Sequence, residues 1–201
     1  MLNLENVFKN YKNNFALKNI NLNLNENKLY VLTGENGSGK STLIKIIANV
    51  IFKSSGIIEK TSSISYLPDK FLLPKIMMTD DFIKSLLKLY NLKINYNDIL
   101  NRFQIPKRMI GSLSKGNYQK LGLFLSFYND CDIYLFDEPI DGLDSFAKDL
   151  FKKLVKEKLD NGKTVIISIH DKSFLNEFDP IIYEIKDGIL NEKKRRKKKQ
   201  S

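Results

Sequence analysis

Apolar and polar residues alternate along two segments near the start of the chain, residues 2–8 (LNLENVF) and 17–24 (LKNINLNL). Alternation of this kind is typical of strands that are buried on one face only, so the two segments predict an antiparallel sheet at the edge of a domain. Three later segments, residues 29–32, 133–136 and 165–169, are short apolar runs. Such runs predict strands that are covered on both faces, as in a parallel sheet.

A helical pattern follows each of these runs, over about 40–50, 144–160 and 171–178, so the order strand, loop, helix repeats along the chain. Between about 70 and 129, apolar residues recur at helical spacing and no strand pattern is found. We therefore predict an α/β fold with a mostly parallel sheet, an antiparallel β edge at the N-terminus and a helical insert at about 70–129.

The length of 201 residues and the hydrophobic content of 42% allow one substantial core, and we expect a single domain over residues 1–192. Its core would consist of residues 1–69 and 130–192, on either side of the helical insert. The pair Asp187–Gly188 predicts a hairpin turn. Residues 193–201 are too highly charged to pack, and we expect them to form a disordered tail.

The positive charge of the chain is concentrated in this tail. Seven consecutive basic residues at 193–199 supply the larger part of the formal net charge of +10, so the folded body is only mildly basic. A tail of this composition is most simply solvated or held at an anionic lipid surface. An arm that binds nucleic acid is the alternative.

The single cysteine, Cys131, excludes an internal disulfide and is consistent with a reducing compartment. No apolar run approaches the roughly 18 residues that span a bilayer, and the first residues lack the pattern of a signal peptide. If the protein works at a membrane, we expect a different chain to cross it.

A glycine-rich segment at 34–41 (GENGSGKS) joins the first apolar run to the first predicted helix. It matches the pattern GxxxxGK(S/T), whose glycines let backbone N–H groups close around phosphate oxygens at a helix N-terminus. In this pattern Lys40 reaches the β and γ phosphates of a nucleotide, and the hydroxyl of Ser41 binds Mg²⁺. The residues predicted to bind the nucleotide here are Gly34, Asn36, Gly37, Ser38, Gly39, Lys40, Ser41 and Thr42.

Two carboxylates, Asp137 and Glu138, end the apolar run at 133–136. The carboxyl end of a parallel sheet is where ligands bind in such folds, so we assign Asp137 to magnesium and Glu138 to the general base that polarises the attacking water. His170 ends another apolar run. Because parallel strands bring their carboxyl ends together, we expect His170 on the same rim.

Ser114 and Gly116 stand directly before an apolar helical segment, LGLFLSF. A helix N-terminus with a hydroxyl and free amides can receive an anion. An ordinary helix cap is the alternative interpretation of this pair.

In their order along nearly the whole chain, these motifs resemble those of the nucleotide-binding domain of the ABC transporter family. Residues 34–41 match the family's first nucleotide motif, and 113–117 (LSKGN) resemble its signature sequence LSGGQ. Residues 133–138 match the second nucleotide motif, 141–144 (DGLD) resemble the D-loop, and His170 matches the switch histidine.

The resemblance implies a P-loop NTPase core with a helical subdomain, and ATP with Mg²⁺ as cofactors. It implies a head-to-tail homodimer in the presence of ATP, in which Ser114 and Gly116 of one subunit contact the γ-phosphate on the other. Asp144, at the end of the D-loop, would also belong to the nucleotide site. Tyr11 lies where an aromatic residue of the family stacks on adenine, although an exposed loop tyrosine is the alternative. Glu138 and His170 would be the catalytic residues.

Two positions depart from the family pattern. The signature has Lys115 and Asn117 where glycine and glutamine are usual. Asp69 aligns with the family's Q-loop glutamine. A carboxylate at that place could be a further ligand of magnesium, but it adds negative charge beside the nucleotide.

The resemblance implies an ATP-hydrolysing subunit that powers a separate integral membrane permease at the cytoplasmic face of the membrane. The compact size is similar to that of ATPase subunits of bacterial exporters for peptides, bacteriocins or drugs. The alternative is a soluble, non-transport ATPase of the same family that acts on nucleic acid or ribosomes. Long coiled coils or a second cassette, which such members generally carry, are not found in this sequence, and we expect no nucleic-acid partner.

Overall fold

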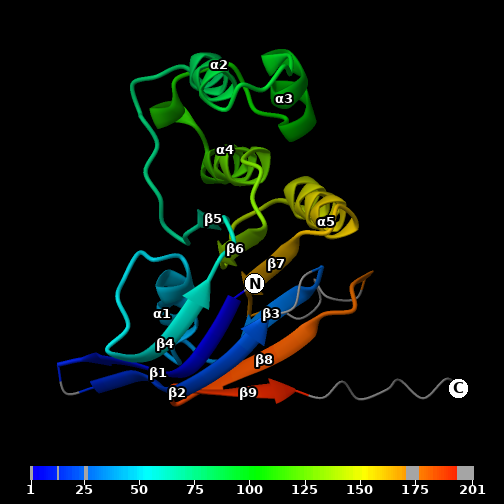
Figure 1. The fold of residues 1–201 in the computed structure, drawn as a ribbon. Coiled ribbons are helices and arrows are strands. Elements are labelled where there is room, and N and C mark those ends of the chain that lie inside the picture. The colour runs from blue at the N-terminus through cyan, green and yellow to red at the C-terminus, as the bar shows by residue number, and fades with distance from the viewer. Residues whose placement is uncertain (1, 13, 25–26, 171–176, 194–201) are drawn as a thin grey trace, which may run out of the picture.

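The computed structural model describes residues 2–12, 14–24, 27–170 and 177–193. Two sheets form the centre of the fold (Figure 1). The first is a three-stranded sheet with the order β2-β1-β4, and the second is a six-stranded sheet with the order β5-β6-β7-β3-β8-β9.

The three-stranded sheet is antiparallel throughout, as the N-terminal alternation predicted. Strand β1 (Leu2–Tyr11) pairs with β2 (Asn14–Leu24) on one side and with β4 (Ser55–Lys60) on the other. The apolar side chains of β1 and β2 are buried on one face. Strand β4 was not predicted, because its two isoleucines are neighbours in sequence and give no alternation.

The six-stranded sheet is parallel except for its last strand. The bounds of its strands are β3 (Leu29–Thr33), β5 (Ile64–Leu67), β6 (Ile133–Asp137), β7 (Thr164–Ser168), β8 (Ile181–Lys186) and β9 (Ile189–Lys193). Every residue of β3, β6 and β7 is buried, so the three apolar runs are strands covered on both faces, as predicted. β9 turns back antiparallel to β8 through Asp187–Gly188, whose φ angles of 51° and 79° are those of a tight hairpin.

The helices lie on both faces of this sheet. Their bounds are α1 (Lys40–Ile47), α2 (Thr79–Leu89), α3 (Tyr96–Phe103), α4 (Lys115–Tyr128) and α5 (Ser145–Asp160), with a 3₁₀ turn η1 (Ile110–Ser112) before α4. Helices α2 to α4 form the predicted helical insert, which stands at the opposite end of the molecule from the antiparallel sheet (Figure 1). Most of the helix predicted at 171–178 lies outside the described residues.

Two apolar cores lie on the two faces of the six-stranded sheet. Within β3, Val31 packs into the core beneath α4 and α5, and its neighbours Tyr30 and Leu32 pack into the core beneath α1 and the antiparallel sheet. Three aromatic rings tie the first core together: Phe127 of α4 lies 4.8 Å from Phe136 of β6, and Phe151 of α5 lies 5.1 Å from Phe136, measured between ring centroids.

The basic segment begins inside the fold. Lys193 is the last residue of β9, pairs with Ile182 and places its Nζ 2.6 Å from Glu184 Oε1, so the sheet includes the first residue of the segment expected to be a tail. Residues 194–201 lie outside the described part of the chain. No helix among the described residues has both the length and the apolar character needed to cross a membrane.

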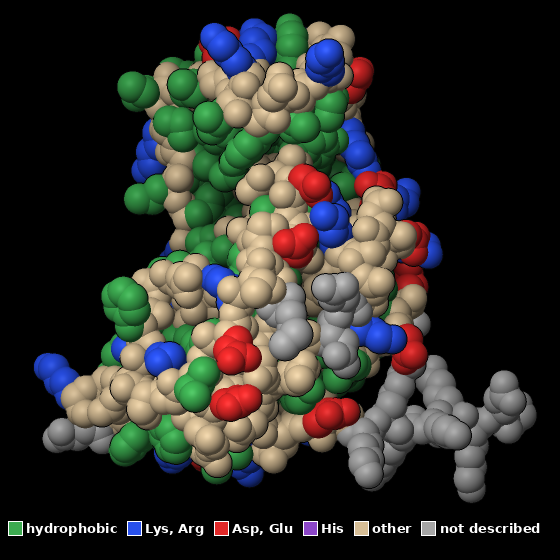
Figure 2. Space-filling model, viewed as in Figure 1, with side chains coloured by type: hydrophobic (Ala, Val, Ile, Leu, Met, Phe, Trp, Pro, Cys, Tyr) green, Lys and Arg blue, Asp and Glu red, His purple; other side chains and the backbone are tan. Residues whose placement is uncertain are grey.

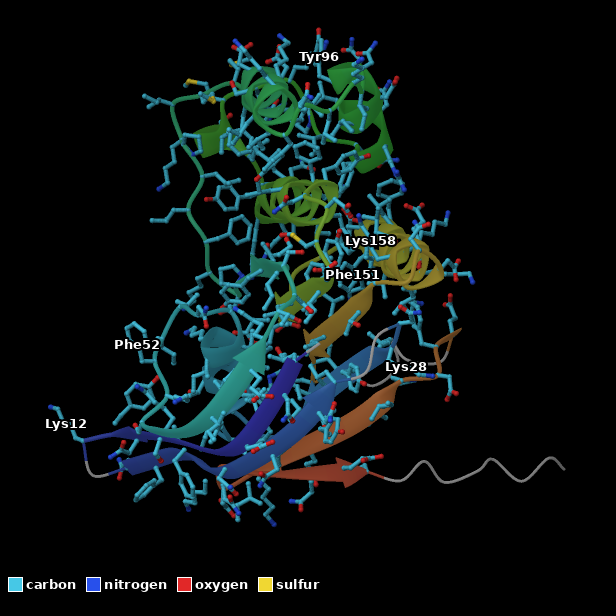
Figure 3. All side chains as sticks on the ribbon, viewed as in Figure 1. Lys12, Lys28, Phe52, Tyr96, Phe151 and Lys158 are labelled. Carbon is cyan, nitrogen blue, oxygen red and sulfur yellow. The ribbon has the colours of Figure 1, made fainter. Side chains whose placement is uncertain are left out.

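Phe151→Ala tests the aromatic contact between α5 and the sheet. The Phe151 ring points into the core, whereas Phe52 points into solvent and is 90% exposed (Figure 3). We expect Phe151→Ala to lower the free energy of unfolding by about 3–5 kcal/mol, because it leaves a cavity. Phe52→Ala, the matched control, should change it by no more than about 0.5 kcal/mol. Urea unfolding measures both, and equal losses would contradict the placement of Phe151.

Candidate active site

The loop between β3 and α1 curves around the side chain of Lys40. The Lys40 ammonium donates hydrogen bonds to the carbonyl oxygens of Gly34 (2.9 Å) and Glu35 (3.0 Å), and only 4% of the residue is exposed. A lysine enclosed by loop amides at a helix N-terminus presents its charge to an anion in the loop. The geometry of the loop therefore suits a phosphate group.

Glycine is required in this loop by backbone conformation and by close neighbours. The φ angles of Gly34, Gly37 and Gly39 are 147°, 78° and 115°, a region that residues with a Cβ rarely adopt. A Cβ added to Gly39 would lie 2.6 Å from the carbonyl oxygen of Ala16, whereas one added to Gly37 would meet nothing within 4 Å. The loop is thus held closely against β2 at its C-terminal end.

Ser38 supports the phosphate interpretation independently. Its Oγ is buried and has no hydrogen-bond partner among the residues that the structure describes. A buried hydroxyl without a partner is costly, and an oxygen of a phosphate bound in the loop would satisfy it. Of the remaining predicted residues, Asn36 lies at the exposed tip of the loop and Thr42 in the first turn of α1.

Asp137 ends β6 at the foot of this loop. Its carboxylate is buried, and Oδ1 accepts hydrogen bonds from Ser41 Oγ (3.0 Å) and from Ser168 Oγ (2.7 Å). The predicted neighbourhood of Asp137 and Ser41 is therefore formed, although the two residues are 96 positions apart in sequence. A hydroxyl and a carboxylate side by side are the oxygen ligands that Mg²⁺ accepts beside phosphate oxygens.

Glu138 follows in an unusual backbone conformation, with φ of 53°. Its backbone N–H donates to Ser168 Oγ (2.9 Å), and its Oε1 lies 2.8 Å from His170 Nε2. A left-handed glutamate costs about 1–2 kcal/mol, and outliers of this kind cluster at functional sites. The two residues predicted as catalytic, Glu138 and His170, are thus in direct contact.

Ser168 was missed from the sequence. It stands inside an apolar run, TVIISI, where a single serine is easily taken for strand filling. Its signal is positional, since Ser168 pairs with Asp137 across β6 and β7. A polar residue at the carboxyl end of a parallel strand beside a known acid would have identified it.

Ser114 and Gly116 lie on the helical insert, at the N-terminus of α4. Ser114 Oγ accepts a hydrogen bond from the backbone N–H of Asn117 (3.3 Å), so within one chain it acts as an ordinary helix cap. A Cβ added to Gly116 would lie 3.9 Å from the carbonyl oxygen of Gly142. The side chain of Lys115 also lies against Gly142. The signature segment and the DGLD segment therefore contact each other in the fold.

Asp144 has a structural task within the chain. Its Oδ1 accepts from the backbone N–H of Ala147 (2.7 Å) at the start of α5, and its Oδ2 lies 3.2 Å from Lys120 Nζ of α4. The hydrogen bond from Ala147, helped by Lys120, lowers the pKa of Asp144 below its ordinary value. Asp144 therefore links the two helices that carry the signature and DGLD segments.

Asp69 is exposed, two residues after the end of β5. Burial raises the pKa of Tyr66, and the charges of Asp137 and Asp69 raise it further. Among the described residues, no group of three or more His, Cys, Asp or Glu side chains is placed to hold a metal ion. A metal here would therefore share Ser41 and Asp137 with phosphate oxygens and water, which is how Mg²⁺ is usually held.

A cavity of about 510 Å³ opens beside the loop. Its walls are the loop itself at 34–38, the β8–β9 hairpin at 184–188, and Phe15, Ala16 and Lys18 of β2. Tyr11 is not part of this lining: it ends β1, half exposed, with Lys9 Nζ 4.8 Å from the centre of its ring. Phe15, which the sequence patterns did not single out, is the aromatic residue at the cavity.

Comparison with known proteins agrees with the resemblance to the ABC transporter family. Residues 17–141 match the family model described as ABC transporter. An uncharacterized ABC transporter ATP-binding protein of Methanocaldococcus jannaschii is 30% identical over 197 residues, which cover 93% of this chain and 74% of that protein. The lantibiotic transport ATP-binding protein SrtF of Streptococcus pyogenes is 30% identical over 200 residues, covering 92% of this chain and 87% of SrtF.

Among solved structures, the fold is similar to the ATP-binding cassette MJ0796, whose structure is described as a dimer in a post-hydrolysis state bound to ADP and Pi. The TM-score is 0.84 at 26% identity, and the match covers 98% of this chain and 99% of the cassette chain. The α/β architecture predicted from the sequence is thus confirmed.

Alanine at two glycines of the loop separates the cost of backbone conformation from the cost of crowding. We expect Gly37→Ala to lower the free energy of unfolding by about 1–2 kcal/mol, the cost of a left-handed residue with a Cβ. Gly39→Ala should cost about 1–3 kcal/mol more, because the added methyl meets Ala16. Thermal unfolding with and without ATP measures both variants. Equal stability of the two would contradict the close packing of the loop against β2.

Proposed function

The chain belongs to the ABC transporter family of ATP-binding proteins, and we propose that it hydrolyses MgATP to drive a separate membrane permease. The observation that carries this proposal is the hydrogen-bonded group beside the phosphate loop. There, three segments of the chain meet: Ser41 lies within hydrogen-bond distance of Asp137, and the next residue, Glu138, lies within hydrogen-bond distance of His170.

Lys40 and the loop amides bind the β and γ phosphates, with Ser38 Oγ gaining the partner that it lacks within the described residues. Ser41 and Asp137 would hold Mg²⁺, and Asp69, two residues after β5 of the same sheet, is proposed as a further ligand. Mg²⁺ supplies neutralisation of the charge on the phosphate oxygens. The chain itself fixes the phosphates, and the hydroxyls of Ser41 and Ser168 hold the carboxylate of Asp137 in place by donating hydrogen bonds to Oδ1.

Glu138 is the general base. His170 Nε2 holds its Oε1 at 2.8 Å, which leaves Oε2 to accept the proton of the water that attacks the γ-phosphate. The side chain of Glu138 is 22% exposed, so a water molecule can reach it. His170 orients the carboxylate of Glu138. As the proposed switch histidine, it would also sense the γ-phosphate.

The complete site is proposed to need two copies of the chain. Ser114 and Gly116 sit on the helical insert, and in a head-to-tail dimer they would contact the γ-phosphate held by the opposite loop. The signature segment lies against the DGLD segment, which ends at Asp144. In the dimer, both segments would therefore lie at the same interface. The dimeric description of the similar cassette MJ0796 supports this arrangement.

A permease partner is supported by the exposed strap at residues 70–78, which leads into the helical insert. Leu72 and Ile76 are 90% and 91% exposed, although the strap is held firmly: Tyr118 Oη accepts from the backbone N–H of Leu73 (2.7 Å) and donates to the carbonyl oxygen of Phe71 (3.2 Å). Exposed apolar side chains on a backbone that is held in place are suited to contact with a partner. Figure 2 shows hydrophobic side chains next to Lys and Arg on this part of the molecule.

We place the protein at the cytoplasmic face of the membrane, held there by the permease. The name of SrtF, a lantibiotic transport protein, supports an exporter of a peptide or bacteriocin, with drugs as the wider class. No observation on the described residues favours action on nucleic acid or ribosomes, and we propose the strap at 70–78 as the docking surface for the permease.

Glu138→Gln tests the assigned base. We expect turnover to fall at least about 100-fold, because proton transfer to a positioned base contributes roughly 10²- to 10⁴-fold. ATP binding should persist, since Lys40 and the loop remain, and the trapped nucleotide should yield a dimer on gel filtration with MgATP. Lys40→Ala in the same background should abolish that dimer. Turnover at the wild-type rate would remove Glu138 from the mechanism, and a monomer with bound ATP would contradict the shared site.

The aromatic residue that receives adenine is tested by Phe15→Ala and Tyr11→Ala. Resemblance to the family points to Tyr11, whereas the cavity is lined by Phe15, and we expect Phe15 to be the contact. Stacking contributes about 1–3 kcal/mol per base, so Phe15→Ala should raise the Kd of ATP roughly 5- to 150-fold. Tyr11→Ala is the control and should have a smaller effect. Fluorescence titration measures both Kd values. A larger rise in Kd for Tyr11→Ala than for Phe15→Ala would assign the adenine contact to Tyr11.

A further inference from the structure

Ser168 contacts both acidic residues of the site. It is fully buried, with 0% exposure. Its hydroxyl donates to Asp137 Oδ1 (2.7 Å) and accepts from the backbone N–H of Glu138 (2.9 Å). A serine hydroxyl has a single hydrogen to donate, so the donor is used on the carboxylate and a lone pair on the next peptide group. One hydroxyl thus joins the side chain of Asp137 to the backbone of Glu138.

The Asp137 carboxylate is held by two donors from different elements. Ser168 of β7 and Ser41 of α1 both donate to Oδ1, at 2.7 Å and 3.0 Å. Two hydrogen bonds to one oxygen fix the rotation of the carboxylate and leave Oδ2 for a metal ion or its bound water. Ser41 keeps its own lone pairs for the metal while it donates to Asp137.

Residues at the carboxyl end of β7 hold Glu138 by its backbone and by its side chain. Ser168 Oγ receives its backbone N–H, and His170 Nε2 contacts its carboxylate. Ser168 and His170 are two residues apart, which is the spacing that puts side chains on the same face of an extended chain. Since the φ of Glu138 is 53°, its backbone needs such a partner to stay in place.

We propose that Ser168 is a positioning residue for ATP hydrolysis, which orients Asp137 toward the metal and Glu138 toward the attacking water. This inference rests on the proposed function, in which Asp137 binds Mg²⁺ and Glu138 is the base. In this role Ser168 acts through its two neighbours, Asp137 and Glu138. Without its hydroxyl, Asp137 loses one of two donors and the backbone N–H of Glu138 loses its acceptor.

Ser168→Ala tests the proposal, because it removes one oxygen atom and adds nothing to a tightly packed site. We expect kcat to fall about 10- to 100-fold, the usual effect of losing a residue that orients a metal ligand. The Mg²⁺ concentration for half-maximal activity should rise as well. The KM and Kd for ATP should stay within about threefold, since Lys40 and the loop amides supply most of the nucleotide affinity. Loss of a serine with only a structural role would not lower kcat and raise the Mg²⁺ requirement while leaving the KM and Kd for ATP nearly unchanged.

Ser65→Ala is the matched control. Ser65 lies on β5 of the same sheet, is also buried, and donates to the carbonyl oxygen of Ser126 (2.8 Å), away from the acids of the site. It should keep the wild-type kcat and Mg²⁺ dependence even if its thermal midpoint falls. Ser168→Thr, which retains the hydroxyl, should be more active than Ser168→Val, which has the same shape without it.

Each outcome decides the matter. Wild-type kcat and Mg²⁺ dependence in Ser168→Ala would overturn the proposal, as would an equal loss in Ser65→Ala or equal activity of the Thr and Val variants. If Ser168→Ala does not fold, the comparison of Thr with Val carries the test. Glu138→Gln in the same assay keeps the proposed function separate: wild-type turnover there would refute the assigned base, whatever Ser168→Ala does.

Discussion

The parallel pairing of β6 with β7 is the contact on which the site depends. In its register Asp137 lies beside Ser168, and Glu138 and His170 follow where the strands end. Because side chains alternate across a strand, a shift of one residue would turn Asp137 away from Ser41. Complete burial of both strands protects the register, since any slip would move apolar side chains out of their packed positions.

The helical insert is joined to this pair of strands by packed side chains. Phe127 of α4 and Phe151 of α5 both contact Phe136 of β6, the residue before Asp137. On the side of the signature segment, Lys120 pairs with Asp144. A displacement of the insert is therefore resisted by the strand that carries Asp137, because close-packed cores deform little. The same packing gives a partner that docks on the strap a continuous physical connection to the site.

The sequence predicted those parts of the protein whose structure follows from the residues of a single short segment. The apolar runs gave β3, β6 and β7, and the loop at 34–41 was visible because glycine, lysine and serine are needed there at fixed spacing. Residues whose role comes from tertiary neighbours were missed. Ser168 acquires its role only through the register of β6 with β7, and Phe15 only through the way β2 passes the loop.

The strand and helix boundaries show the same limit. β4 has two adjacent isoleucines and no alternation, and it is a strand because β1 offers it an edge. The segment of α3 is polar on most of its surface and was recognised only as part of the helical insert; it is fixed by a cap at Asn95 and by the burial of Ile99, Leu100 and Phe103. In each case pairing or packing between distant segments decided the outcome.

If Glu138 is the base, as proposed above, its left-handed backbone sets stability against activity. Glycine adopts that conformation freely, so the residue that the backbone prefers at 138 is one that cannot accept a proton. A library selected for heat resistance alone would be drawn toward glycine at this position, and its most stable members would bind nucleotide without consuming it. With Glu138 as the proposed base, thermal tolerance and turnover thus favour different residues at position 138.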